Sequence, residues 1–156
     1  MDTKRKGAFT FRAAAVLFVL SAMLEFVVWR TEVPLFGAIR GGLVASAYHL
    51  LYATLYVILG VGLWSAQRWT YAVVLATTAV YTVDKLQTMF LSRDVIVERL
   101  MQEIAGSPEL LQVVNRESML QMVLLVSVTF IACWWGFAWY THLRRDYFKP
   151  GTRHSS

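Results

Sequence analysis

Four long apolar stretches fill most of this chain of 156 residues, and nearly all charged side chains lie between them. The stretches cover about 12–30, 41–64, 69–91 and 119–143. A helix of roughly 20 apolar residues is long enough to cross the hydrocarbon core of a bilayer. A water-soluble domain of this size could not bury four helices that are apolar on every side. The sequence therefore predicts an all-α integral membrane protein, in which one transmembrane domain is built as a four-helix bundle.

The distribution of basic residues predicts the orientation of the four helices. The N-terminal arm, the short connection after the second stretch and the C-terminal tail together carry nine basic and two acidic residues. The loops on the opposite side carry five basic and six acidic residues. Because cytoplasmic segments of membrane proteins are enriched in lysine and arginine, we expect both termini in the cytoplasm of a cell's inner (plasma) membrane. These basic ends are also expected to attract anionic lipid, and no nucleic acid is expected as a partner.

The outer connection, residues 92–118, has the pattern of short amphipathic helices. Its first half places Val97, Leu100, Met101 and Ile104 at the spacing i, i+3, i+4 and i+7, which is one face of a helix. A second helix is expected to start at the sequence Ser-Pro-Glu that begins at residue 107. We therefore predict a short amphipathic helical hairpin on the outer side, between the third and fourth spans.

Small residues in the second stretch indicate where helices pack closely. Gly42, Ser46, Gly60 and Gly62 are predicted to lie at helix–helix contacts, because small side chains let the backbones of membrane helices approach each other. The loop that precedes this stretch contains Pro34 and Gly37, both helix breakers, and is expected to be a connection without helix.

Polar residues within the apolar stretches are the main candidates for function, since a charge inside a bilayer costs several kcal/mol. All four stretches bring at least one polar side chain to the outer third of the predicted membrane. On the third stretch, Tyr81, Asp84 and Lys85 share one helix face. The candidates for a ligand or ion site are Glu25, His49, Tyr52, Tyr81, Asp84, Lys85 and Gln121.

If these faces point inward, Glu25 can pair with Lys85, and Asp84 can pair with His49 or a tyrosine hydroxyl. Such pairs can also serve only to fix helix register. No metal site is predicted, because His49, Glu25 and Asp84 lie on three different helices and lack the spacing of a known metal site. No catalytic residue is assigned, because no activated serine or cysteine is recognisable beside them, and no cofactor is predicted.

Three functions remain compatible with this pattern. The first is a non-enzymatic subunit or scaffold of a larger membrane assembly, whose partners are the lipid bilayer and other membrane subunits or copies of itself. The second is a homo-oligomeric ion channel or small-solute transporter that uses Glu25, His49, Asp84 and Lys85. The third is a membrane-embedded enzyme that acts on a lipid or a quinone. Because almost all of the chain is predicted to lie in the membrane, we expect the first.

Overall fold

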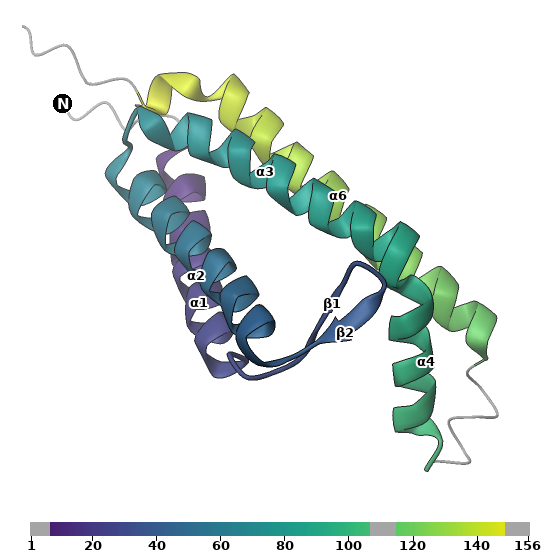
Figure 1. Ribbon diagram of the computed structural model, residues 1–156. Helices are drawn as coiled ribbons and strands as arrows, with labels where there is room; N and C mark the ends of the chain where they lie inside the picture. Colours follow the sequence, from purple (N-terminus) through teal and green to yellow (C-terminus); the bar gives the residue numbers. More distant parts are fainter. Residues whose placement is uncertain (1–6, 107–114, 149–156) are drawn as a thin grey trace, which may run out of the picture.

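The computed structural model describes residues 7–106 and 115–148, and this part of the chain is almost entirely helical (Figure 1). Its long helices are α1 (Ala8–Val27), α2 (Gly42–Ser65), α3 (Trp69–Gln87), α4 (Arg93–Ile104) and α6 (Arg116–Leu143). The all-α class is as predicted. The second helix of the predicted outer hairpin, in residues 107–114, lies outside the described residues.

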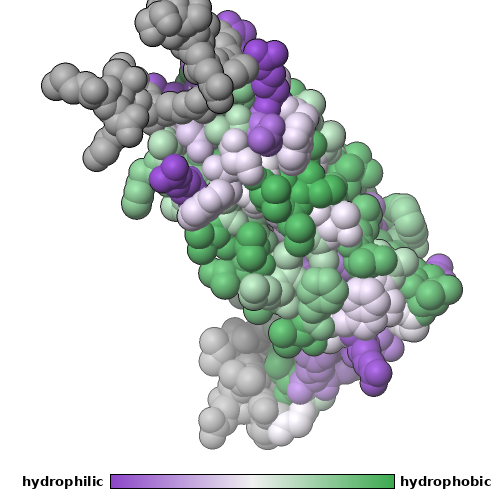
Figure 2. Space-filling model, turned by 90° about the vertical axis from the view of Figure 1, so that its left-hand side faces the viewer, coloured by the Kyte–Doolittle hydropathy of each residue, from purple (hydrophilic) through white to green (hydrophobic). Residues whose placement is uncertain are grey.

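Three of the described helices, α1, α2 and α6, are long and apolar enough to cross a membrane. Helix α3, expected as the third of four spans, is less apolar, because it carries Asp84, Lys85 and Gln87 near its end together with several threonines. On the surface seen in Figure 2, hydrophobic side chains gather over the middle of the molecule and hydrophilic ones near its two ends. The structure thus supports a membrane protein with at least three apolar helices.

The helices are arranged as two pairs (Figure 1). Helix α1 packs along α2, and α3 packs along α6, with fewer contacts between the pairs. The pairs meet at the end where α1 begins and α6 ends, and they spread apart toward the other end. The short turn between α2 and α3 brings the pairs together. In this turn, Ala66 adopts a left-handed conformation with φ of 52° and caps α2 by donating its N–H to the carbonyl oxygen of Leu63.

A small β-hairpin follows α1, where the sequence analysis expected only a connection. Strands β1 (Val33–Leu35) and β2 (Ala38–Arg40) pair antiparallel through a two-residue turn. Phe36 and Gly37 occupy the turn with positive φ values of 50° and 77°, as a type I′ hairpin requires. The expected absence of helix is confirmed, and the regular pairing is an addition to it.

This hairpin docks on the end of α3. The helix widens there into a π-helical turn, η1 (Thr88–Ser92), before α4 begins. The backbone N–H of Phe36 donates to Gln87 Oε1 at 2.9 Å, and that of Gly37 donates to Ser92 Oγ at 3.1 Å. Gln87 Nε2 in turn donates to the carbonyl oxygen of Pro34 at 3.1 Å. Gln87 at the end of α3 and Ser92 of the π-turn therefore hold the hairpin between the spread ends of the two helix pairs.

Helix α4 confirms the prediction that the first half of residues 92–118 is helical. It bends away from α3 and carries exposed ion pairs to neighbouring segments. Arg99 is hydrogen-bonded to Glu32, and this bond raises the pKa of the guanidinium. Arg116 Nη2 lies 2.7 Å from Asp94 Oδ1 and so links the starts of α6 and α4.

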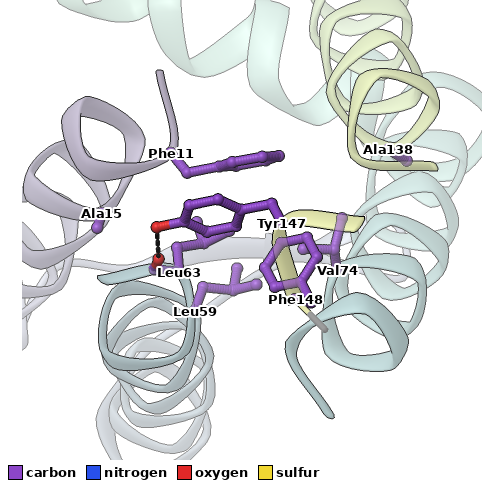
Figure 3. Close-up of a cluster of buried hydrophobic side chains, with 8 residues drawn as sticks. All are labelled: Phe11, Ala15, Leu59, Leu63, Val74, Ala138, Tyr147 and Phe148. Carbon is purple, nitrogen blue, oxygen red and sulfur yellow. Dashed lines mark hydrogen bonds between the residues drawn. The ribbon is translucent and has the colours of Figure 1, made fainter. Parts of the chain in front are cut away.

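The main hydrophobic core lies where the helix pairs meet (Figure 3). The turn η2 (Arg145–Phe148), which follows α6, folds back so that its aromatic side chains enter this core. The Tyr147 ring stacks on Phe11 with 4.6 Å between the ring centroids, and Tyr147 Oη donates to the carbonyl oxygen of Leu63 at 3.1 Å. This part of the tail, which the sequence analysis treated only as a basic cytoplasmic segment, thus ties together the ends of α1, α2 and α6.

Replacing Tyr147 by phenylalanine should lower the free energy of unfolding by about 1 kcal/mol, since the ring remains and one buried hydrogen bond is lost. The measurement is unfolding of the protein in mixed micelles, followed by circular dichroism. Tyr71→Phe is the matched control, because that hydroxyl lies 2.8 Å from His142 Nδ1 at an exposed position. An equal loss of stability in both variants would contradict this prediction.

Candidate functional site

Two small polar clusters lie toward the spread end of the helix pairs. In the first, Glu25 of α1 faces His49 of α2, with Glu25 Oε2 at 2.7 Å from His49 Nδ1. His49 Nε2 lies 3.3 Å from both Oγ1 and the carbonyl oxygen of Thr31. The imidazole is buried, and both of its nitrogens have a polar neighbour. This cluster joins α1, α2 and the segment that leads to the hairpin.

The second cluster centres on Asp84 of α3. Its Oδ2 accepts a hydrogen bond from Tyr48 Oη at 3.1 Å and lies 3.2 Å from Lys85 Nζ. The Lys85 ammonium also lies 5.1 Å from the centroid of the Tyr81 ring, where a cation is attracted to the ring face. The carboxylate is therefore compensated by a hydroxyl from α2 and by the ammonium of its own helix.

These pairs differ in part from those predicted. Asp84 does bond a tyrosine hydroxyl, but the prediction that Glu25 pairs with Lys85 is wrong. The reason is helix order: α1 packs against α2, so the nearest inward polar group to Glu25 is His49. Gln121 does not join either cluster, since its side chain is exposed and its Nε2 lies 3.5 Å from Glu117 Oε1 on the same helix.

Aromatic rings of α2, α3 and α6 connect the two helix pairs next to the polar clusters. The rings of Tyr48 and Tyr52 lie 4.8 Å apart, and the Tyr52 ring meets Tyr81 of α3 edge-on at 6.1 Å. Tyr81 in turn lies 5.2 Å from Trp134 of α6. Tyr52 is only 3% exposed, and its hydroxyl has no hydrogen-bond partner within residues 7–106 and 115–148. Trp134 was not among the residues predicted for the site.

A cavity of about 320 Å³ lies beside the second cluster. It is open on one side and lined by residues from the hairpin and from α2, η1, α3, α4 and α6, and most of its wall is apolar. Its lining residues are Pro34, Tyr48, Lys85, Thr88, Ile96, Met122, Val123, Val126, Ser127 and Phe130. Only Lys85 among the predicted site residues lines it. The contribution of α6 was missed, because its apolar side chains cannot be distinguished in sequence from those that face lipid.

The glycines of α2 occupy two very different kinds of position. A Cβ on Gly60 would lie 2.8 Å from Val19 Cγ2 of α1, and one on Gly62 would lie 2.5 Å from Thr70 Oγ1 of α3. Gly42 has no such neighbour within 4 Å. Ser46 is half-buried near the start of the helix. The close approach of α2 to α1 and α3 thus depends on the two glycines near the C-terminal end of α2.

Within the residues that the structure describes, no group of three or more His, Cys, Asp or Glu side chains is arranged to hold a metal ion. Comparisons of the chain with protein-family models, with curated proteins and with solved structures found no match. What the chain does must therefore be inferred from its own geometry.

Proposed function

We propose that this chain is a four-span, non-enzymatic membrane protein that acts as a subunit or scaffold of a larger membrane assembly. Helix α3 is a span in addition to α1, α2 and α6, because its 19 residues extend about 28 Å at 1.5 Å per residue. Its polar side chains at Thr77 and Asp84 point toward the other helices, whereas Val80 and Val83 are exposed on its outer face. A helix with this distribution can lie in a bilayer while its charges are shielded by the protein.

In this proposal both termini are cytoplasmic, and the polar clusters and α4 lie on the outer side. The excess of basic residues at the end where α1 begins and α6 ends supports this orientation. The inner membrane of a cell is then the location of the protein, and anionic lipid surrounds its basic end.

The exposure of α6 is the observation that carries the proposal. This helix has 28 residues, of which only Ser127, Ala138 and Thr141 are buried. By contrast, α2 has eight buried residues in 24. Opposite the buried face of α6 lies Gly136, where an added Cβ would meet no atom within 4 Å. It borders an apolar groove of about 480 Å³ between α3 and α6. Because membrane helices associate through small residues and close packing, this face suits a transmembrane helix of another chain.

The polar clusters also favour a subunit over a pore. A pore lined by α1 would need the Glu25 carboxylate on an open face of the protomer. In the structure that carboxylate points toward α2 and contacts His49. A pair of this kind fixes the register of two helices, which is the role expected of it in a scaffold.

The test is purification from the native membrane in mild detergent, followed by mass spectrometry of the intact complex. We expect a stoichiometric partner chain, a second copy included, and we expect Gly136→Leu to remove it, because the added side chain blocks close approach of a helix. Val83→Phe adds comparable bulk to an exposed position of α3 and should retain the partner. A protein that purifies alone, or a partner that survives Gly136→Leu, would overturn the proposal.

A further inference from the structure

The cavity beside Asp84 and Lys85 has the form of a binding site that is reached from the lipid. Three of its α6 residues, Met122, Val126 and Phe130, are also substantially exposed on the outer surface of that helix. Its volume of about 320 Å³ lies at the lower end of the range found for ligand pockets. An apolar chain could therefore extend past these residues into the bilayer while a small head group occupies the cavity.

The polar end of the cavity presents hydrogen-bond donors. A lysine ammonium has three N–H donors. Among the described residues, the hydrogen-bond acceptor recorded near Lys85 Nζ is the Asp84 carboxylate, at 3.2 Å. Tyr48 and Thr88 line the same end, but their hydroxyl protons are directed to Asp84 Oδ2 and to the Asp84 carbonyl oxygen. The ammonium thus retains donor capacity next to an apolar space, where an acceptor on a ligand would form a charge-assisted hydrogen bond.

The charge balance decides which acceptor fits. Asp84 already neutralises Lys85, so an anionic head group would leave an uncompensated negative charge in a region of low dielectric constant. A carbonyl oxygen accepts the same hydrogen bond without adding charge. The ring of Phe130 and the ring of Pro34 offer apolar surfaces for the rest of the head group.

We propose that this cavity binds the head of an uncharged lipid that carries a carbonyl oxygen, with Lys85 as the hydrogen-bond donor and the lipid tail passing α6 into the bilayer. A quinone and an acylglycerol both have this chemistry. This binding function goes beyond the proposed role as a subunit and does not depend on it, because the cavity lies within one protomer.

The experiment is titration of the purified full chain in detergent with three probes, followed by native mass spectrometry. The probes are a quinone with a decyl tail, a monoacylglycerol and a fatty acid of equal chain length. We expect one of the two uncharged probes to bind about tenfold or more tightly than the fatty acid, because the carboxylate of the fatty acid would add a negative charge that Lys85, already paired with Asp84, does not compensate. The probe that binds distinguishes a quinone site from an acylglycerol site.

Two variants test the position of the site. Val126→Phe should fill the cavity and weaken binding about tenfold, whereas Val128→Phe, two residues along α6 at an exposed position outside the lining, should leave it unchanged. Lys85→Gln, tested with a plain hydrocarbon of equal length as a fourth probe, should reduce the preference for the uncharged carbonyl probe over that hydrocarbon. Equal binding of the fatty acid, or equal effects of the two phenylalanine variants, would overturn the proposal. Because binding is measured on the isolated protomer, this outcome is independent of the test for a partner chain.

Discussion

Replacing Gly60 by alanine is expected to destabilise the packing of α1 on α2, and replacing it by leucine should prevent that packing. The added Cβ would lie 2.8 Å from Val19 Cγ2 and 3.2 Å from the backbone carbonyl oxygen of Ala15. A side chain can rotate away, but the backbone oxygen can move only if the two helices separate. Overpacking of this kind costs about 1–3 kcal/mol for a methyl group, and a leucine side chain should exceed that range. The measurement is the free energy of unfolding in mixed micelles, followed by circular dichroism.

Gly136→Ala provides the matched control in the isolated protein. Gly136 also lies within a long apolar helix, but an added Cβ there would meet no atom within 4 Å. Alanine favours a helix over glycine by about 0.5–1 kcal/mol, so this variant should be unchanged or slightly more stable. If Gly60→Ala were as stable as Gly136→Ala, the tight contact between α1 and α2 would be absent from the folded protein.

The contrast between these glycines shows what the sequence could predict about the fold. Apolar length alone was sufficient to locate α1, α2 and α6, because a bilayer sets the length of a spanning helix. Helix packing at Gly60 and Gly62 follows from the general preference for small residues, but Gly42 obeys the same preference and has no neighbour. Which small residues face another helix depends on helix rotation, and a helix that is apolar on every side carries no periodic signal of that rotation.

The prediction of the polar pairs was limited by the same lack of information about helix arrangement. Sequence spacing placed Glu25, His49 and Asp84 at similar depths, and the structure brings each of them to a polar partner. The identity of the partner depends on which helices are adjacent: α1 lies against α2, whereas α3 packs mainly against α6. The hairpin was missed for a different reason: strands of three residues, at Val33–Leu35 and Ala38–Arg40, are too short to show alternation.

Contacts between the two ends of the described chain could also not be predicted from the sequence. Tyr147 follows two arginines, so its surroundings resemble a solvated basic tail. In the structure its ring reaches Phe11, near the opposite end of the chain. This contact depends on the turn η2, which folds back after α6, and no local sequence pattern predicts that turn.

Replacing Asp84 by leucine should be among the most destabilising single changes in this protein. The substitution removes the carboxylate that compensates Lys85, at 3.2 Å, and that accepts a hydrogen bond from Tyr48, at 3.1 Å. Breaking a fully buried ion pair by removal of one partner costs about 3–5 kcal/mol, because the remaining charge is left without compensation. Because the Lys85 side chain is 22% exposed, we expect a cost at the lower end of that range. Asp94→Leu is the matched control. Its carboxylate also bonds a cation, Arg116, but both side chains are exposed, and such pairs contribute about 0–1 kcal/mol.

The double variant Asp84→Leu/Lys85→Leu separates loss of the pair from loss of the carboxylate itself. With both charges removed, no ion is left uncompensated in the interior, and most of the lost stability should return. Addition of Tyr48→Phe should restore the remainder, since the orphaned hydroxyl is then absent. The same unfolding measurement in mixed micelles applies to the whole series. If the double variant were as unstable as Asp84→Leu alone, the carboxylate would have a role beyond compensation of Lys85.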